Sequence, residues 1–300
     1  MMRSIEVELR RLLARRLFRV VTLLVVIGFT IAGVLTFVNS SNDPALVAAA
    51  EAERQAQVEQ CVTGFERGHG GPGKPAPGDA RSFCEENVWV EKPGFTYTEV
   101  NWILMTMGIP MIMLAWLVGA SFMGAEWSNR TITSLLTWEP RRLRVLGAKI
   151  IALALVAFLW IVALQGYLAA VLYPSGHFRG STAGMDAAFW SDLAGVTLRV
   201  GIVAVVAALM GFSLATAGRN TAAALGVGFA HLAIVEGLIR AFRPSWMDWL
   251  IGDNLGLFLV GAEDVNHLGH SQTAAGALLV AYGLVLVVAA AAIFRRREVA

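Results

Sequence analysis

The chain has 300 residues, of which 56% are hydrophobic and 15% are charged, and its formal net charge is +2. Soluble domains carry about 25% charged residues, so this composition excludes an ordinary soluble protein and predicts an integral membrane protein. The small net charge hides an uneven distribution, because basic residues gather near both termini and in the middle of the chain.

Residues 1–16 predict an amphipathic helix at the membrane interface. The apolar positions are Ile5, Leu9, Leu12, Leu13 and Leu17, and the arginines that fall mostly on the other side are Arg10, Arg11, Arg15 and Arg16. A basic amphipathic helix can lie in the interface with its arginines against anionic headgroups, so membrane lipids are expected contacts. The same arginines could instead act only as topogenic charge, and the sequence leaves both interpretations open.

Six apolar runs are long enough to cross a bilayer, because a helical span needs about 20 apolar residues. Hydrocarbon offers the backbone no hydrogen-bond partner, so these runs should be helices. The predicted spans are residues 17–38, 101–123, 149–172, 193–217, 221–239 and 273–294. The first run is longer than the apolar core of a signal peptide, and we interpret it as an uncleaved span. The predicted fold class is an all-α integral membrane protein with six transmembrane helices.

Basic residues indicate the orientation of these spans. With a cytoplasmic amino terminus, the cytoplasmic side receives 15 of the 24 lysines and arginines but only 5 of the 22 acidic residues. Lysine and arginine near span ends favour the cytoplasmic side. We therefore expect a multi-pass protein of the plasma membrane with both termini in the cytoplasm.

The predicted extracytoplasmic loop, residues 39–98, contains both cysteines of the chain, Cys61 and Cys84. An Ala/Glu/Gln-rich patch of helical character comes before Cys61, and a Gly/Pro-rich linker separates the two cysteines. On the oxidising side of a membrane this pair predicts a disulfide. No histidine pair lies nearby at ligand spacing, so a metal site is not expected.

Residues 126–142 are polar and separate two apolar runs. The pattern predicts a short cytoplasmic helix that begins at Glu126, is anchored by Trp127, Leu135 and Leu136, and is stopped by Pro140. Such a helix, joined to two spans, would move both spans if something outside the membrane pushed it.

Residues 243–267 form an apolar stretch in a predicted extracytoplasmic loop. Its apolar runs are too short to span, and we expect Gly252 to Asn254 to break the stretch into the two arms of a re-entrant hairpin. An aromatic belt anchored by Trp246 and Trp249 is an alternative interpretation, and both can hold together.

The stretch from residue 126 to 149 resembles the cytoplasmic loop of ABC-2 type transporter permeases. The matching residues are Glu126, Thr131, Leu135, Leu136, Pro140, Arg141, Arg142 and Lys149. The glycine that usually precedes the threonine is Arg130 here, and this form of the motif resembles that of actinobacterial members. The resemblance implies that residues 126–142 are a coupling helix that touches an ATPase. The predicted coupling residues are Glu126, Trp127, Thr131, Leu135, Leu136, Pro140, Arg141 and Arg142.

The resemblance also implies partners and a function. In that family two permease copies, identical or different, pair with two ATP-binding cassette ATPase subunits. This chain has no phosphate-binding loop motif, so the ATPase would be a separate chain. The chain would therefore be a transport subunit rather than an enzyme, with no cofactor and no nucleic-acid partner. Family precedent favours export, and spans with few ionisable groups favour a hydrophobic or amphiphilic substrate such as a drug or lipid.

Four residues are candidates for the transport path: His231 and Glu236 in the fifth span, and Trp246 and Trp249 after it. Glu236 and Arg240 are four residues apart and can pair on one helix face. The alternatives are a membrane-embedded enzyme and a channel or structural membrane protein. The candidate residues of the enzyme are His231 and Glu236 in the fifth span, and His267, His270, Glu263 and Asp264 outside the membrane. The enzyme lacks an evident third catalytic group, and the channel lacks a filter sequence.

Overall fold

The computed structural model describes residues 2–66, 80–90, 93–129, 131–132, 141–261 and 268–296. Within these ranges the chain is helical, and its one β feature is a single bridge between Thr96 and Ser181. Six helices in this part of the chain are long and apolar enough to cross a membrane, which confirms the predicted all-α membrane fold. They are Arg16–Asn39 (α2), Tyr97–Ser128 (η1 with α5), Arg142–Arg179 (α7), Ala187–Gly218 (α8), Thr221–Phe242 (α9, η2 and α10) and Gln272–Arg296 (α12).

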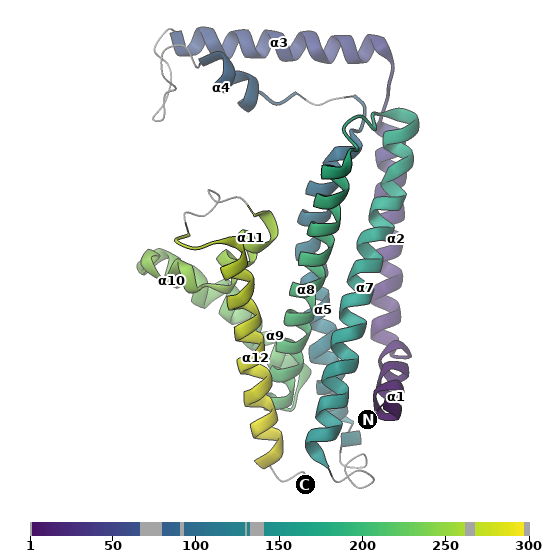
Figure 1. Ribbon diagram of the computed structural model, residues 1–300, viewed down its shortest axis with the longest axis vertical. Coiled ribbons are helices and arrows are strands. Elements are labelled where there is room, and N and C mark those ends of the chain that lie inside the picture. Colours follow the sequence, from purple (N-terminus) through teal and green to yellow (C-terminus); the bar gives the residue numbers. More distant parts are fainter. Residues whose placement is uncertain are drawn as a thin grey trace. The chain divides into compact units, whose positions relative to one another are not determined.

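The chain forms two compact units (Figure 1). Unit 1 comprises Met1–Gly28, Asn101–Leu168 and Trp190–Ala300, and unit 2 comprises Phe29–Val100 and Ala169–Phe189. The helices α2 and α7 therefore contribute to both units. In unit 1, the amino-terminal helix α1 (Met2–Leu13) and the last turns of α12 lie at the same end, which we call the termini end (Figure 1).

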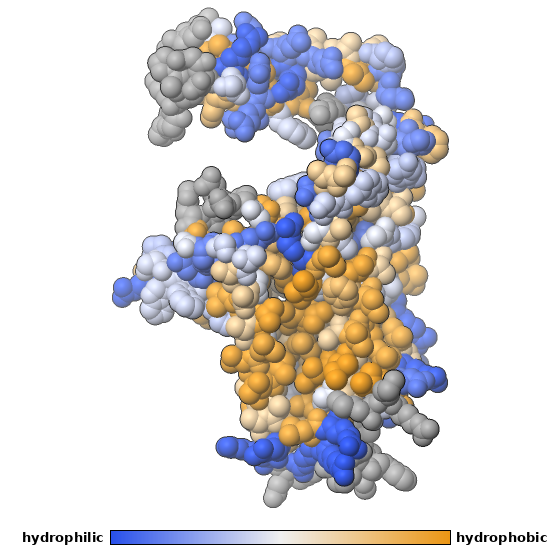
Figure 2. All heavy atoms as spheres, in the orientation of Figure 1, coloured by the Kyte–Doolittle hydropathy of each residue, from blue (hydrophilic) through white to orange (hydrophobic). Residues whose placement is uncertain are grey.

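Unit 1 is built on close packing between α5 (Val100–Ser128) and α8. A Cβ atom at Gly119 would lie 1.9 Å from the carbonyl oxygen of Ala208, and one at Gly211 would lie 2.5 Å from that of Trp116. Only glycine therefore permits this approach, as small residues do at many helix contacts in membranes. Figure 2 shows a hydrophobic surface over the middle of the helices and hydrophilic residues where α12 ends. This distribution suits helices surrounded by lipid.

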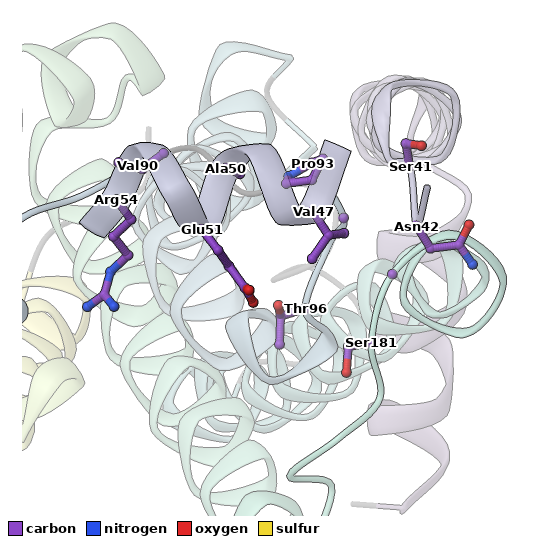
Figure 3. A pocket seen from close by; sticks show the side chains of 12 residues that line it. Ser41, Asn42, Val47, Ala50, Glu51, Arg54, Val90, Pro93, Thr96 and Ser181 are labelled. Atoms are coloured by element: carbon purple, nitrogen blue, oxygen red, sulfur yellow. The ribbon is translucent and has the colours of Figure 1, made fainter. Parts of the chain in front are cut away.

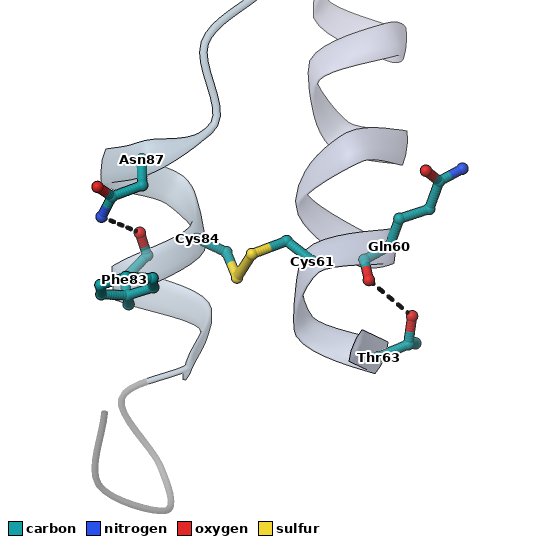
Figure 4. The surroundings of a disulfide bond; sticks show 6 residues. All are labelled: Gln60, Cys61, Thr63, Phe83, Cys84 and Asn87. Atoms are coloured by element: carbon teal, nitrogen blue, oxygen red, sulfur yellow. Dashed lines mark hydrogen bonds between the residues drawn. A yellow bond between two sulfur atoms is a disulfide. The ribbon is translucent and has the colours of Figure 1, made fainter. Parts of the chain in front are cut away.

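Unit 2 contains the helices α3 (Pro44–Glu66) and α4 (Ala80–Asn87), and a disulfide joins them (Figure 4). The bond links Cys61 to Cys84, with the Cα atoms 5.9 Å apart, so the predicted disulfide is confirmed. Phe65 and Phe83 pack edge to face next to it, at 5.3 Å between ring centroids. This small apolar contact and the covalent link together hold α4 on α3.

A cavity of about 230 Å³ lies beneath α3 in unit 2 (Figure 3). Its floor includes the bridged residues Thr96 and Ser181, and the side chain of Glu51 points from α3 toward Thr96. Gly180 also lines the cavity, and a Cβ atom at this position would lie 1.9 Å from the carbonyl oxygen of Phe95. Glycine is therefore required where these two segments meet.

The segment after α10 (Glu236–Phe242) differs from the expected hairpin. It contains a 3₁₀ helix, η3 (Pro244–Trp249), and a helix, α11 (Ile251–Val260), and the chain turns at Leu250, where the backbone is extended. Gly252 to Asn254 therefore do not break the segment, because they lie in the first turns of α11. The carboxylate of Glu236 stabilises the start of α11, since it accepts the backbone N–H of Ile251 at 2.8 Å and that of Gly252 at 3.1 Å.

Removing the disulfide should loosen unit 2 without affecting the membrane helices. A bond that closes a loop with a sequence separation of 23 stabilises by about 3 kcal/mol in the loop-entropy estimate. A protein with both Cys61→Ser and Cys84→Ser should be cleaved faster within α3 and α4 by a protease, while fragments of α5 and α8 stay protected. Equal cleavage rates in the oxidised protein and the double variant would contradict this expectation.

Candidate functional site

A fully buried lysine lies at the termini end of unit 1. Lys149, in the first part of α7, has no exposed surface. Its Nζ atom donates to Oε2 of Glu8 at 2.7 Å and to Oε1 of Glu126 at 2.8 Å. These contacts join α7 to α1 and to the last turns of α5, three segments that are far apart in the sequence.

Arg15 completes this charge cluster, which consists of Glu8, Arg15, Glu126 and Lys149. Its guanidinium donates to the carbonyl oxygens of Ser121 at 2.8 Å and Phe122 at 2.9 Å, and it lies 3.4 Å from Oε1 of Glu126. The ring of Phe122 lies beneath both cations, 4.8 Å from Arg15 and 5.0 Å from Lys149. These contacts attach Arg15 to the backbone of α5 as well as to Glu126.

The two carboxylates of the charge cluster also meet a third cation, since the more exposed Arg11 lies 3.2 Å from Oε1 of Glu8. Burial lowers the pKa of Arg15 from its ordinary value, and the charges of Glu126 and Glu8 oppose that shift. Buried charges are tolerated when they are paired and hydrogen-bonded, and removing one partner is costly because the other is left without compensation. The four charges therefore hold α1, α5 and α7 in one arrangement.

The structure describes only part of the predicted coupling helix. Glu126 and Trp127 lie in the last turns of α5, and Oγ1 of Thr131 donates to the backbone oxygen of Glu126 at 3.3 Å. Arg141 is exposed just before α7, which begins at Arg142. The remaining predicted coupling residues, Leu135, Leu136 and Pro140, lie outside the described residues.

The side chains of Glu126 and Trp127 face the interior of unit 1. Glu126 is 7% exposed and points into the charge cluster. The ring of Trp127 packs edge to face on Phe294 of α12, at 6.2 Å between centroids, and the guanidinium of Arg219 lies 5.0 Å from its centroid. The end of α5 is thus attached to α12 as well as to α1 and α7.

The sequence analysis did not assign a role to Glu8, Arg15 or Lys149 in a common site. One signal was present: Glu8 lies between Ile5 and Leu12 at helical spacing, on the apolar face of the amphipathic helix. An acidic residue on such a face indicates a buried basic partner. The sequence alone does not show which cation that is.

A second site is a cavity of about 490 Å³ in unit 1, farther along α5 and α12 from the termini end. Apolar and aromatic side chains from α5, α8, α9 (Thr221–Ala230), η2 (His231–Val235), η3 and α12 form its walls. The residues that bear an aromatic or polar group are Trp116, His231, Trp246, Trp249 and Tyr282. This volume lies within the range of about 300–1,000 Å³ that is usual for small-molecule sites.

Ionisable groups adjoin the cavity at His231, which is the one of the four residues below that lines it. The Nε2 atom of His231 is 3.6 Å from Oε1 of Glu236. Arg240 lies 3.2 Å from Glu236, which confirms the predicted pairing, and 3.0 Å from Asp253 of α11. We call these four residues the polar end of the cavity. His231 opens a π-helical turn, a feature that is frequent at functional sites.

Three of the four predicted path residues, His231, Trp246 and Trp249, line this one cavity, and Glu236 lies behind His231. Sequence reasoning missed Trp116, Tyr282 and Asp253, which other segments bring to the site. The hydroxyl of Tyr282 donates to the carbonyl oxygen of Trp249 at 2.9 Å, so α12 is attached directly to η3.

Gly228 determines where the ring of Trp116 lies. A Cβ atom at Gly228 would be only 1.8 Å from Cζ2 of that ring, so any other residue would displace the indole. Gly226, two residues earlier in α9, has nothing within 4 Å of such a Cβ atom. The two glycines therefore form a matched pair for testing the cavity wall.

A comparison with protein families assigns the chain. A family model described as ABC-2 family transporter protein matches residues 2–242. The chain belongs to this family. The match includes all of the charge cluster and ends at Phe242, the last residue of α10. No curated protein matches the chain. Membership confirms the resemblance and makes the chain a permease of an ABC transporter, a transport subunit in the membrane.

Replacing Lys149 with methionine should destabilise this ABC-2 permease strongly. The variant removes the buried cation that Glu8 and Glu126 share, and removing one partner of a buried ion pair typically costs about 3–5 kcal/mol. We expect a lower melting temperature of the purified protein in circular dichroism. Adding Glu8→Gln and Glu126→Gln to Lys149→Met should recover part of the loss, because fewer uncompensated charges remain.

The control for this experiment is Arg10→Ala, which breaks the exposed pair between Glu6 and Arg10. An exposed pair of this kind contributes little to stability. If Lys149→Met melted at the same temperature as Arg10→Ala, the charge cluster would not hold these segments together.

Replacing Gly228 with alanine should disturb the cavity wall. The added methyl group collides with the Trp116 ring, and overpacking of this kind costs about 1–3 kcal/mol. The control, Gly226→Ala, should be neutral or stabilising by up to about 1 kcal/mol, because alanine favours the helix. Thermal unfolding monitored by circular dichroism compares the two variants, and equal melting temperatures would argue against the tight Gly228–Trp116 contact.

Proposed function

We propose that this ABC-2 permease exports a hydrophobic or amphiphilic compound, using ATP hydrolysis by a separate ATP-binding cassette subunit. Two copies of each subunit would form the transporter. The absence of a phosphate-binding loop motif from the whole sequence supports the separate ATPase. The aromatic and apolar walls of the cavity support an amphiphilic substrate.

We also propose that the termini end of unit 1 faces the cytoplasm and that the protein lies in the plasma membrane. The basic residues support this orientation, since this end includes α1 and the last turn of α12, with Arg295 and Arg296. The disulfide in unit 2 supports an extracytoplasmic location for that unit, since disulfides persist in oxidising compartments.

Helix α5 would couple ATP hydrolysis to movement of the cavity wall, and the continuity of this helix is the observation that supports the proposal. Glu126 in the charge cluster and Trp116 in the cavity wall lie ten residues apart on one continuous helix, about 15 Å along its axis. An ATPase that pushed the segment after Glu126 would therefore move the cavity wall. The charge cluster would make α1 and α7 move with it.

In this mechanism the predicted coupling residues have different roles. Arg141 and Thr131 are exposed and can contact an ATPase, whereas the buried Glu126 acts through Lys149 and Arg15. Export then follows from a rigid-body switch between inward-facing and outward-facing states, driven by contacts that differ between the two states.

Reversing the charge of Arg141 should weaken the contact with the ATPase. An acidic residue before the first turn of α7 is compatible with that helix, so Arg141→Glu should fold normally. We expect at least about a tenfold loss of affinity, or 1.4 kcal/mol, for the cassette ATPase that co-purifies with the unmodified permease. Co-purification and permease-stimulated ATP hydrolysis measure the effect.

The matched control is Arg243→Glu, which makes the same charge change at an exposed arginine after α10. It should bind and stimulate the ATPase as the unmodified protein does. Normal ATPase binding and stimulation by the Arg141→Glu protein would remove residues 126–142 from the docking surface.

A further inference from the structure

An arginine lies unpaired in a membrane-spanning helix of unit 1. Arg199 is in the first half of α8, a helix that is long and apolar enough to cross a membrane. Its Nε atom is buried without a hydrogen-bond partner, and none of the described residues forms an ion pair with its guanidinium. Asp192, the one acidic residue of α8, lies two turns earlier. A cation in this position is costly unless something supplies a counter-charge.

The neighbouring residues show which side of α8 Arg199 occupies. A Cβ atom at Gly108 of α5 would lie 2.7 Å from Cγ2 of Val200, and one at Gly201 would lie 3.0 Å from the ring of Phe158 in α7. Successive residues point about 100° apart around a helix. Arg199 therefore lies on a third side of α8, away from the contacts with α5 and α7.

Helix α12 meets this third side farther along α8. Val206, seven residues after Arg199 on the same face, packs against Gly283 of α12, where a Cβ atom would lie 3.0 Å from Cγ1 of Val206. From there α8 and α12 diverge with increasing distance from the termini end (Figure 1). Arg199 lies in the diverging part and is partly exposed.

The residues beside Arg199 on its exposed side are apolar or small. Leu198 is 49% exposed and Ile202 is 42% exposed. A Cβ atom at Gly195, one turn before Arg199, would meet nothing within 4 Å. One positive charge therefore adjoins an exposed apolar surface and free space. This combination suits a molecule with an anionic group and a long apolar chain.

From these observations we propose that Arg199 belongs to a binding site for a phospholipid of the surrounding bilayer. The phosphate group accepts hydrogen bonds from the guanidinium of Arg199 beside Gly195, and an acyl chain lies along Leu198 and Ile202. A guanidinium can donate two parallel hydrogen bonds to one phosphate. A soluble anion would leave the apolar side chains uncovered, so a lipid fits better. The site is separate from the cavity, whose lining does not include Arg199, and it does not depend on the proposed function.

Displacement of a fluorescent lipid tests the proposal. A phosphatidylglycerol labelled on its acyl chain is bound to the full-length permease in detergent, and its release is followed by fluorescence anisotropy. Dioleoylphosphatidylglycerol should displace it at least about tenfold more effectively than dioleoylglycerol, which has the same chains but no phosphate. Inorganic phosphate should not displace it. Equal displacement by the two lipids, or displacement by inorganic phosphate, would overturn the proposal.

Variants of Arg199 test whether its charge holds the phosphate. Arg199→Gln should weaken binding of the labelled lipid at least about fivefold, whereas Arg199→Lys keeps the charge and should keep most of the affinity. The matched control is Arg81→Gln, which makes the same charge change at an exposed arginine of α4 and should bind as the unmodified protein does. If folded Arg199→Gln protein bound the lipid as tightly as the control, Arg199 would not hold the phosphate.

Gly195→Leu tests the same site without a change of charge. Leucine fits at this position without a collision and favours the helix more than glycine does. Its side chain should occupy the space of the phosphate and weaken binding several-fold. Gly166→Leu in α7 is the control, because a Cβ atom there also meets nothing within 4 Å. This pair keeps the test decisive if Arg199→Gln does not fold, and equal binding by the two leucine variants would place the lipid elsewhere.

Melting temperatures distinguish a lipid site from a structural arginine. Removing an unpaired charge relieves a cost, so Arg199→Gln protein in lipid-free detergent should melt no lower than the unmodified protein. Added dioleoylphosphatidylglycerol should raise the melting temperature of the unmodified protein more than that of the variant. A lower melting temperature of the variant, together with equal responses to the lipid, would show a structural role and overturn the proposal. Unchanged lipid affinity of the variant with loss of a subunit in size-exclusion chromatography would also overturn it, because a second permease copy would then cover this face.

Discussion

The buried ammonium group of Lys149 is the constraint on which the termini end of unit 1 depends. A charge with no exposed surface must be paired, and its two carboxylate partners come from α1 and α5. Helix α1 is therefore attached to the protein through Glu8, with Leu12 fully buried beside it, and does not rest on the interface through its arginines alone. One of those arginines, Arg15, is turned inward to α5.

Because its helices pack closely, the rest of unit 1 should move together with the termini end. Gly119 and Gly211 bring α5 and α8 so close that neither helix can slide without a backbone collision. Gly228 then brings α9 against the ring of Trp116. Packed elements of this kind change between discrete arrangements and do not deform continuously, so a displacement of α5 reaches the cavity as a rigid movement.

The sequence predicted those features that depend on local composition. Apolar runs of sufficient length predicted all six long helices, and two cysteines in one loop predicted the disulfide. Features that depend on distant partners could not be read in this way. Gly252 to Asn254 were expected to break a hairpin, but Glu236 accepts the backbone N–H groups there and α11 begins before them. Likewise, no local pattern relates Gly228 to Trp116.

The two charged sites differ in their surroundings. In the charge cluster, the buried Lys149 and the half-buried Arg15 pair with Glu8 and Glu126, and these ion pairs hold α1, α5 and α7 together. At the polar end of the cavity, Arg240 lies 3.2 Å from Glu236 and 3.0 Å from Asp253. Ionisable groups within a membrane are costly and usually mark a functional path. The charge cluster lies between packed helices and fixes their arrangement, whereas His231 of the polar end opens onto a cavity of a size that suits a small molecule.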